Sequence, residues 1–133
     1  MNTKPEAVQP PDVPTSEEFT RTMGQICWLM TLSPAHRDRP ISLIEAHVSA
    51  PLMLKQVRVY LKDKQPVAVV IWAYASDDIK QKIDGGYHTM ALNDWRSGPE
   101  VVVVDCISPF APPETFVNQF MAQVPSPNKR QPT

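Results

Sequence analysis

The first apolar residues of the chain recur at helical spacing. Thr15 and Glu18 form a capping box, in which each side chain accepts a hydrogen bond from the other residue's backbone N–H, so we expect a helix to begin there. An apolar stripe follows, formed by Phe19, Met23, Ile26 and Met30, with Cys27 and Leu29 beside it. The pattern predicts one amphipathic helix that ends near Leu32. Gly24 weakens the helix propensity, which predicts close packing at that point.

The rest of the pattern alternates between strands and short helices. Alternation over residues 57–62 predicts a half-buried strand, and the continuous apolar run over residues 67–73 predicts a central one. A turn over residues 63–66 would join the two as a hairpin, and a third strand over residues 101–104 leads to Asp105. Short helices are expected near Pro51, from Asp77 to Gly85-Gly86, and from Pro112 through Phe116 and Phe120. This order predicts a mixed α/β layer fold.

Length and proline content set the expected domain limits. The 133 residues suit one domain, and the 15 prolines are concentrated at both ends. We therefore predict a folded domain over residues 15–124, between disordered Pro-rich tails at residues 1–14 and 125–133.

Charge and cysteine content exclude several classes of protein. A net charge of −1 gives no reason to expect nucleic-acid binding. Between residues 36 and 64, six basic residues outnumber three acidic ones, and this excess is either a solvated face or a docking patch for an acidic partner. Cys27 and Cys106 are too few for a disulfide framework and lack a zinc-binding spacing. Without a signal-like start or a run of about 18 apolar residues, we expect a cytoplasmic protein with no membrane span.

Two residues are candidates for acid–base chemistry. In Ser33-Pro34-Ala35-His36, Ser33 suits a helix N-cap and Pro34 the first helical position, so we expect His36 at a helix N-terminus. The partial positive charge there would keep the imidazole neutral and available as a base. Asp105 ends an apolar strand and needs a hydrogen-bonded partner. From the residues alone, a surface role for His36 and a turn-capping role for Asp105 stay open.

Other candidate sites are weaker. We assign His47 and His88 structural or surface roles, because neither has metal-ligand spacing. Ser33 is not in a nucleophile elbow, and no phosphate-binding glycine loop is present. Trp28, Trp72 and Trp95 are expected in the core.

Longer blocks of the sequence carry a resemblance. The segment GQICWLMTLSPAHRDRPISL, then Gln65-Pro66-Val67-Ala68, Trp72-Ala73, Asp94-Trp95-Arg96-Ser97-Gly98 and Val104-Asp105-Cys106-Ile107-Ser108-Pro109-Phe110 follow one another in order. These blocks resemble those of the RTX toxin-activating lysine acyltransferases.

The resemblance implies a GNAT-like fold with a mainly antiparallel sheet. It further implies transfer of a fatty acyl group from acyl carrier protein to an internal lysine of a protein such as an RTX protoxin, without a bound cofactor or metal. His36 and Asp105 match the catalytic pair, and Ser33 matches a supporting serine. In such an enzyme His36 would deprotonate the lysine or carry the acyl group, and Asp105 would orient it. Arg37, Arg39 and Arg58 are candidates for docking the acidic carrier.

The family usually continues beyond the point where this chain ends, so we expect a short member that lacks the usual C-terminal portion. A homodimer or another partner could then cover the exposed sheet edge. A non-catalytic adaptor that binds an acyl carrier or a secretion-system protein is the alternative function.

Overall fold

The computed structural model describes residues 13–86 and 89–124 of the protein. The elements follow in the order α1 (Ser16–Thr31), α2 (Ser42–Ile44), η1 (Glu45–Ser49), α3 (Ala50–Met53), β1 (Val57–Lys62), β2 (Gln65–Ala75), α4 (Asp77–Asp84), η2 (Leu92–Trp95), β3 (Glu100–Ile107) and α5 (Pro113–Gln123). The predicted mixed α/β class is confirmed, and a GNAT-like arrangement is compatible with this order. Residues 1–12 and 125–133 of the two predicted tails lie outside the described residues.

Helix α1 begins where its capping box predicts. The Glu18 N–H donates to Thr15 Oγ1 over 3.1 Å, and the Thr15 N–H donates to Glu18 Oε1 over 2.9 Å. Ile26, Leu29 and Met30 are buried from the same helix. The expectation of close packing at Gly24 is wrong, because a Cβ added there would meet no atom within 4 Å.

The sheet has three antiparallel strands in the order β1-β2-β3. Asp63 and Lys64 connect β1 to β2 with φ angles of 53° and 69°, a left-handed pair that matches the twist of a tight hairpin. The predicted turn was too long, because Gln65 and Pro66 already belong to β2.

Strand β3 contains a bulge that decides where Asp105 points. Ile71 of β2 pairs with Asp105, whereas the next residue, Trp72, pairs with Val103, which leaves Val104 as the extra residue. Val104 packs with the core on the α1 side, so regular alternation would turn Asp105 toward α5. The bulge instead keeps Asp105 on the α1 side. Asp105 lies within β3, which continues to Ile107. The expectation that the strand ends before Asp105 is therefore wrong.

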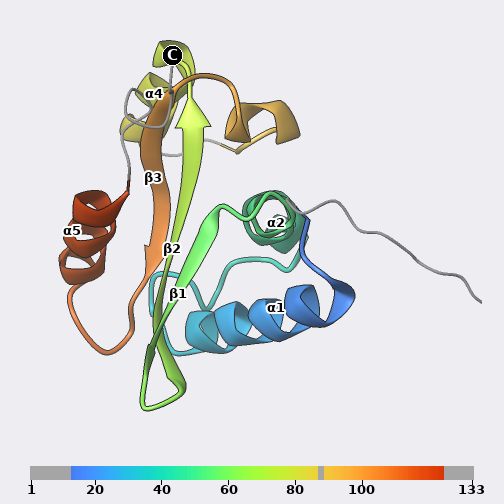
Figure 1. The fold of residues 1–133 in the computed structure, drawn as a ribbon, viewed down its shortest axis with the longest axis vertical. Coiled ribbons are helices and arrows are strands. Elements are labelled where there is room, and N and C mark those ends of the chain that lie inside the picture. Colours follow the sequence, from blue (N-terminus) through green and yellow to red (C-terminus); the bar gives the residue numbers. More distant parts are fainter. Residues whose placement is uncertain (1–12, 87–88, 125–133) are drawn as a thin grey trace, which may run out of the picture.

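Helices cover both faces of the sheet (Figure 1). The larger core lies between the sheet and α1, and a smaller one containing Trp72 and Phe120 lies beneath α5. Trp95 is fully buried, but Trp28 is 40% exposed, so its assignment to the core was wrong. No helix in the described part of the chain is long and apolar enough to cross a membrane.

Elements α2, η1 and α3 form one continuous helical segment, which begins earlier than the short helix expected near Pro51. Its middle portion is a π-helix that ends just before Pro51, a residue without a backbone N–H. This segment packs beside α1 and places Ile41 and Ile44 opposite that helix.

Candidate active site

A tight turn presents His36 to the sheet. The backbone N–H groups of His36 and Arg37 both donate to the Ser33 carbonyl oxygen over 2.9 Å, and residues 34–38 form turns. The predicted helix N-terminus at this point is therefore wrong, and Ser33 is not its cap. The turn follows α1 directly and leaves the side chain of His36 buried, with 5% exposure.

Both ring nitrogens of His36 have hydrogen-bonding partners. Nδ1 lies 2.6 Å from Ser33 Oγ, and Nε2 lies 3.0 Å from Asp105 Oδ1. A carboxylate only accepts, so we assign the ring hydrogen of the neutral imidazole to Nε2. Nδ1 is then left as an acceptor for the Ser33 hydroxyl. The arrangement links a hydroxyl, an imidazole and a carboxylate in one buried chain of hydrogen bonds, as acyl-transfer sites commonly do.

Asp105 is held as a carboxylate by its neighbours. Its Oδ1 also accepts from the Cys106 N–H over 2.9 Å, and Arg39 Nη1 donates to Oδ2 over 2.8 Å. Burial raises the pKa of Asp105, but the hydrogen bond and positive charge of His36, followed by the charge of Arg39, outweigh it and lower the pKa below its usual value. The carboxylate therefore stays ionised beside the imidazole and can stabilise the imidazolium form.

Two cavities of different character border this chain of residues. One has a volume of about 470 Å³ and lies between α1 and the segment before η1, with its apolar wall formed by Met23, Cys27, Met30, Ile41 and Ile44. His36 is also among the residues that line it. The other cavity, of about 190 Å³, lies at Asp105 and is bordered by Arg39, His47 and Val104. An alkyl group fits the first cavity by its chemistry, whereas the second mixes the polar groups of Arg39, His47 and Asp105 with Leu43, Ile83 and Val104.

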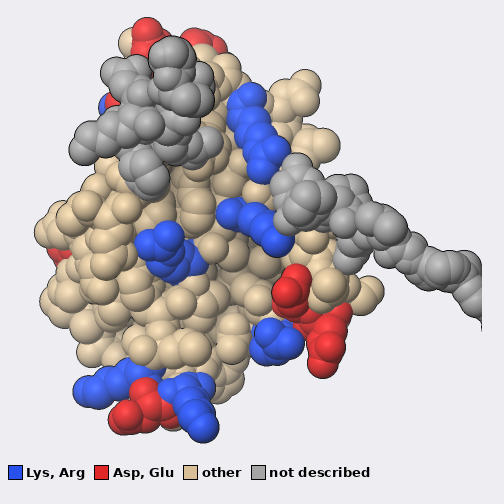
Figure 2. Space-filling view, viewed as in Figure 1, with Lys and Arg blue, Asp and Glu red and all other residues tan. Residues whose placement is uncertain are grey.

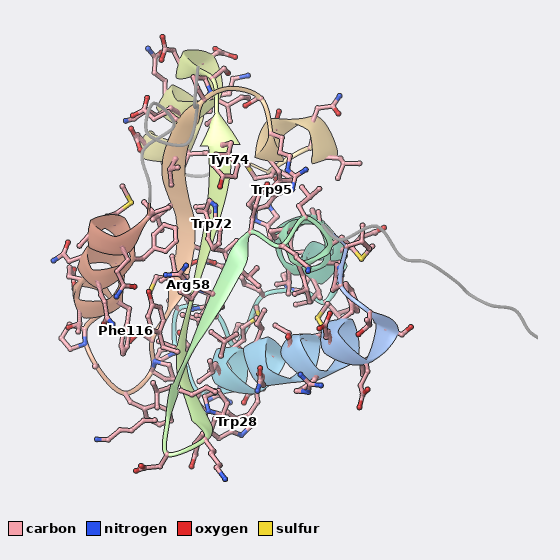
Figure 3. All side chains as sticks on the ribbon, in the orientation of Figure 1. Trp28, Arg58, Trp72, Tyr74, Trp95 and Phe116 are labelled. Carbon is pink, nitrogen blue, oxygen red and sulfur yellow. The ribbon has the colours of Figure 1, made fainter. Side chains whose placement is uncertain are left out.

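The predicted docking arginines are divided between two faces of the molecule. Arg37 and Arg39 border the apolar cavity, although Arg39 is also paired with Asp105. Arg58 lies on the α5 side, where its guanidinium is 5.5 Å from the centre of the Phe120 ring (Figure 3). The structure therefore does not bring Arg58 together with Arg37 and Arg39. On the face drawn in Figure 2, the basic side chains form separate islands.

The remaining histidines have other positions. His47 Nε2 accepts from the Met90 N–H over 3.3 Å at the edge of the cavity at Asp105, and His88 lies outside the described residues. Within residues 13–86 and 89–124, no three His, Cys, Asp or Glu side chains are grouped as a metal site would require.

Sequence reasoning missed two features of the site. It read Arg39 as a carrier-docking residue, whereas the structure pairs Arg39 with Asp105, and its position three residues after His36 could have suggested a shared turn. The apolar stripe of α1 was read as core alone, yet Met23, Cys27 and Met30 also line a cavity.

The comparison with known proteins decides the family. Residues 15–130 match the RTX toxin acyltransferase family. The chain belongs to this family. His36 and Asp105 both lie within the matched region.

Several relatives match much of the chain. This chain is 31% identical over 88 residues to the protein-lysine myristoyltransferase RtxC of Kingella kingae. The match covers 66% of this chain and 53% of the relative. The chain is 30% identical over 107 residues to the protein-lysine palmitoyltransferase CyaC of Bordetella bronchiseptica, covering 80% and 57%. An uncharacterized protein of Synechocystis is 25% identical over 119 residues, covering 88% and 80%. The chain thus spans between about half and two thirds of the length of the two named enzymes.

Proposed function

We propose that the protein is a cytoplasmic protein-lysine acyltransferase. The donor would be a fatty acyl group on acyl carrier protein, and the acceptor an internal lysine of a protein such as an RTX protoxin. The observation that carries the proposal is the buried chain of Ser33, His36 and Asp105 beside an apolar cavity. Family membership supports it, as do the names of relatives that transfer myristoyl or palmitoyl groups to protein lysines.

The central task of such an enzyme is to deprotonate the acceptor. A lysine ammonium has a pKa near 10.4, so removing its proton at pH 7 costs about 4 to 5 kcal/mol. The cavity at Asp105 offers a carboxylate to an incoming ammonium. His36 takes one proton from this ammonium and releases it to solvent, which leaves a neutral amine. The amine nitrogen then attacks the thioester carbonyl, the C–N amide bond forms and the C–S bond breaks. His36 receives the second proton that the nitrogen loses and gives it to the leaving thiolate.

The hydrogen bonds of His36 favour its role as a base over a role as an acyl carrier. An acyl group on Nδ1 would displace the Ser33 hydroxyl at 2.6 Å, and one on Nε2 would break the contact with Asp105 at 3.0 Å. Protonation of the ring instead keeps both contacts, because the Ser33 oxygen can accept from an Nδ1–H while Asp105 accepts from the Nε2–H. Asp105 and Arg39 then hold the ring in place and balance its charge.

Carrier docking is part of the same proposal. Arg37 is exposed at the mouth of the apolar cavity, where a basic side chain would favour approach of an acidic carrier with its thioester directed toward His36. Arg39 adds positive charge there, and Arg58 would act only on a carrier that reaches the other face of the sheet.

The decisive experiment follows the loss of acyl groups from charged acyl carrier protein by intact-mass spectrometry. We expect the wild-type chain to discharge the thioester and to acylate an acceptor protein. His36→Gln and Asp105→Asn should reduce the rate by a hundredfold or more, because acid–base catalysis commonly contributes about 10² to 10⁴. Asp78→Asn is the matched control, since Asp78 is an exposed carboxylate on α4.

The outcomes separate the two candidate functions. Full activity in His36→Gln would overturn the assignment of the base. Binding of the carrier without any discharge, unchanged in His36→Gln, would favour a non-catalytic adaptor.

A further inference from the structure

We propose that the apolar cavity beside His36 binds the acyl chain of the thioester and limits its length. This inference rests on the proposed function and specifies its substrate. The occupant follows from the contrast between the two cavities: the one at Asp105 mixes charged and polar groups with Leu43, Ile83 and Val104, whereas the surface of the one at His36 is almost entirely apolar.

The wall formed by α1 suits a flexible alkyl chain. Met23, Cys27 and Met30 lie at positions i, i+4 and i+7, so they form one continuous stripe along the helix. Methionine side chains are unbranched and adaptable, which lets them follow an alkyl chain of variable shape. The Cys27 sulfur lies 3.7 Å from the Met23 sulfur, and burial raises the pKa of the Cys27 thiol, so the wall remains uncharged.

The wall opposite α1 exposes apolar side chains to solvent, an arrangement that costs free energy unless something covers them. Ile41 is 86% exposed, and Ile44 reaches the same cavity from the next helical turn. An alkyl chain in the cavity would cover both residues. Because His36 is among the residues that line the cavity, a thioester whose alkyl chain lies there would have its carbonyl group near this residue.

Binding can be measured without turnover. S-alkyl pantetheine thioethers of increasing chain length carry the alkyl group but no transferable acyl group. We expect their affinity, measured by calorimetry, to rise up to about fourfold for each added methylene until the cavity is full, and then to level off. The same ligands should slow alkylation of Cys27 by iodoacetamide. Cys106, on the opposite face of the sheet, is the internal control and should not be protected.

A substitution that fills the cavity tests the limit on chain length. In Cys27→Trp the affinity should level off at a shorter chain than in the wild type. Met121→Trp is the matched control, because Met121 is an exposed residue of α5 on the other side of the sheet, and it should keep the wild-type profile.

The outcomes distinguish this inference from the proposed function. Chain-length-dependent binding with Cys27 protection but no acyl transfer would support the cavity and overturn the enzyme. Acyl transfer with the same chain-length profile in Cys27→Trp and the wild type, or no protection of Cys27 by any thioether, would overturn the cavity. The protection experiment uses only the wild-type chain, so the inference stays falsifiable even if Cys27→Trp does not fold.

Discussion

The pKa of the Cys106 thiol is affected by the neighbouring carboxylate of Asp105. Burial raises the pKa of Cys106 to about 11, and the negative charges of Asp105 and Glu114 add to the effect. At pH 8 its thiolate is roughly 200-fold scarcer than that of an unperturbed cysteine. The Cys106 thiolate is, however, more nucleophilic than that of an unperturbed cysteine, because its pKa is higher. This offsets part of the difference in thiolate concentration. We therefore expect iodoacetamide to label Cys106 roughly 20-fold more slowly than a free cysteine.

The measurement is a time course of alkylation followed by peptide mass spectrometry. The same chain in denaturant provides the reference rate, because unfolding removes both the burial and the fixed carboxylates. If Cys106 reacted as fast in the folded chain as in the unfolded one, its surroundings would not be those described above.

At the same scale, the sequence suggested which residues to consider for a site but not how they are arranged. His36, Asp105 and Ser33 could be named because an imidazole, a carboxylate and a hydroxyl stood in blocks that resemble one family. Their hydrogen bonds could not be derived, because they depend on a turn that propensity misread. Ser33 and Pro34 favour a helix start equally well, but here the Ser33 side chain bonds to the His36 ring instead of to a backbone N–H.

The elements of the fold were predictable where periodicity was strong. The capping box of α1, the hairpin and α5 all occur where the pattern placed them. The bulge in β3 was not predictable, since four successive valines before Asp105 fit any register. That single extra residue puts Asp105 on the same face of the sheet as His36. The contact between these two residues therefore depends on strand pairing, which the local sequence does not encode.

Replacing either of two glycines by alanine should change stability in opposite directions. Gly24 lies exposed inside α1 with open space around it, so Gly24→Ala should raise the free energy of unfolding by about 0.5 to 1 kcal/mol through better helix propensity. Chemical denaturation followed by far-UV circular dichroism measures the change.

Gly98→Ala is the contrasting control. A Cβ at Gly98 would come within 2.5 Å of the Ser76 backbone, where the loop after η2 packs against the end of β2. We expect this variant to lose about 1 to 3 kcal/mol or more, as overpacked sites do. A destabilised Gly24→Ala would show that α1 packs against something at that position after all.

At the scale of the whole molecule, the candidate active site also connects the helical layer to the sheet. His36 and Arg39 follow α1, whereas Asp105 belongs to β3, so their contacts tie the helical layer to the sheet. Replacing Asp105 by Asn removes the charge and leaves Arg39 without its carboxylate. We expect Asp105→Asn to lower the free energy of unfolding at pH 7 by about 1 to 3 kcal/mol.

The pH dependence of this loss of stability distinguishes the contribution of the Asp105 charge from that of its packing. Because the folded state lowers the pKa of Asp105, its contribution is fully present above the unfolded value near 3.9 and is lost as the pH falls through the lowered folded value. Urea unfolding of the wild type and Asp105→Asn should therefore show a difference in stability that is present at pH 5 and above and that narrows below about pH 4. Asp78→Asn, which changes an exposed carboxylate on α4, should shift stability by less than about 0.5 kcal/mol throughout. A gap between wild type and Asp105→Asn that stayed constant into strong acid would mean that packing of the side chain, and not its ionised form, joins the helical layer to the sheet.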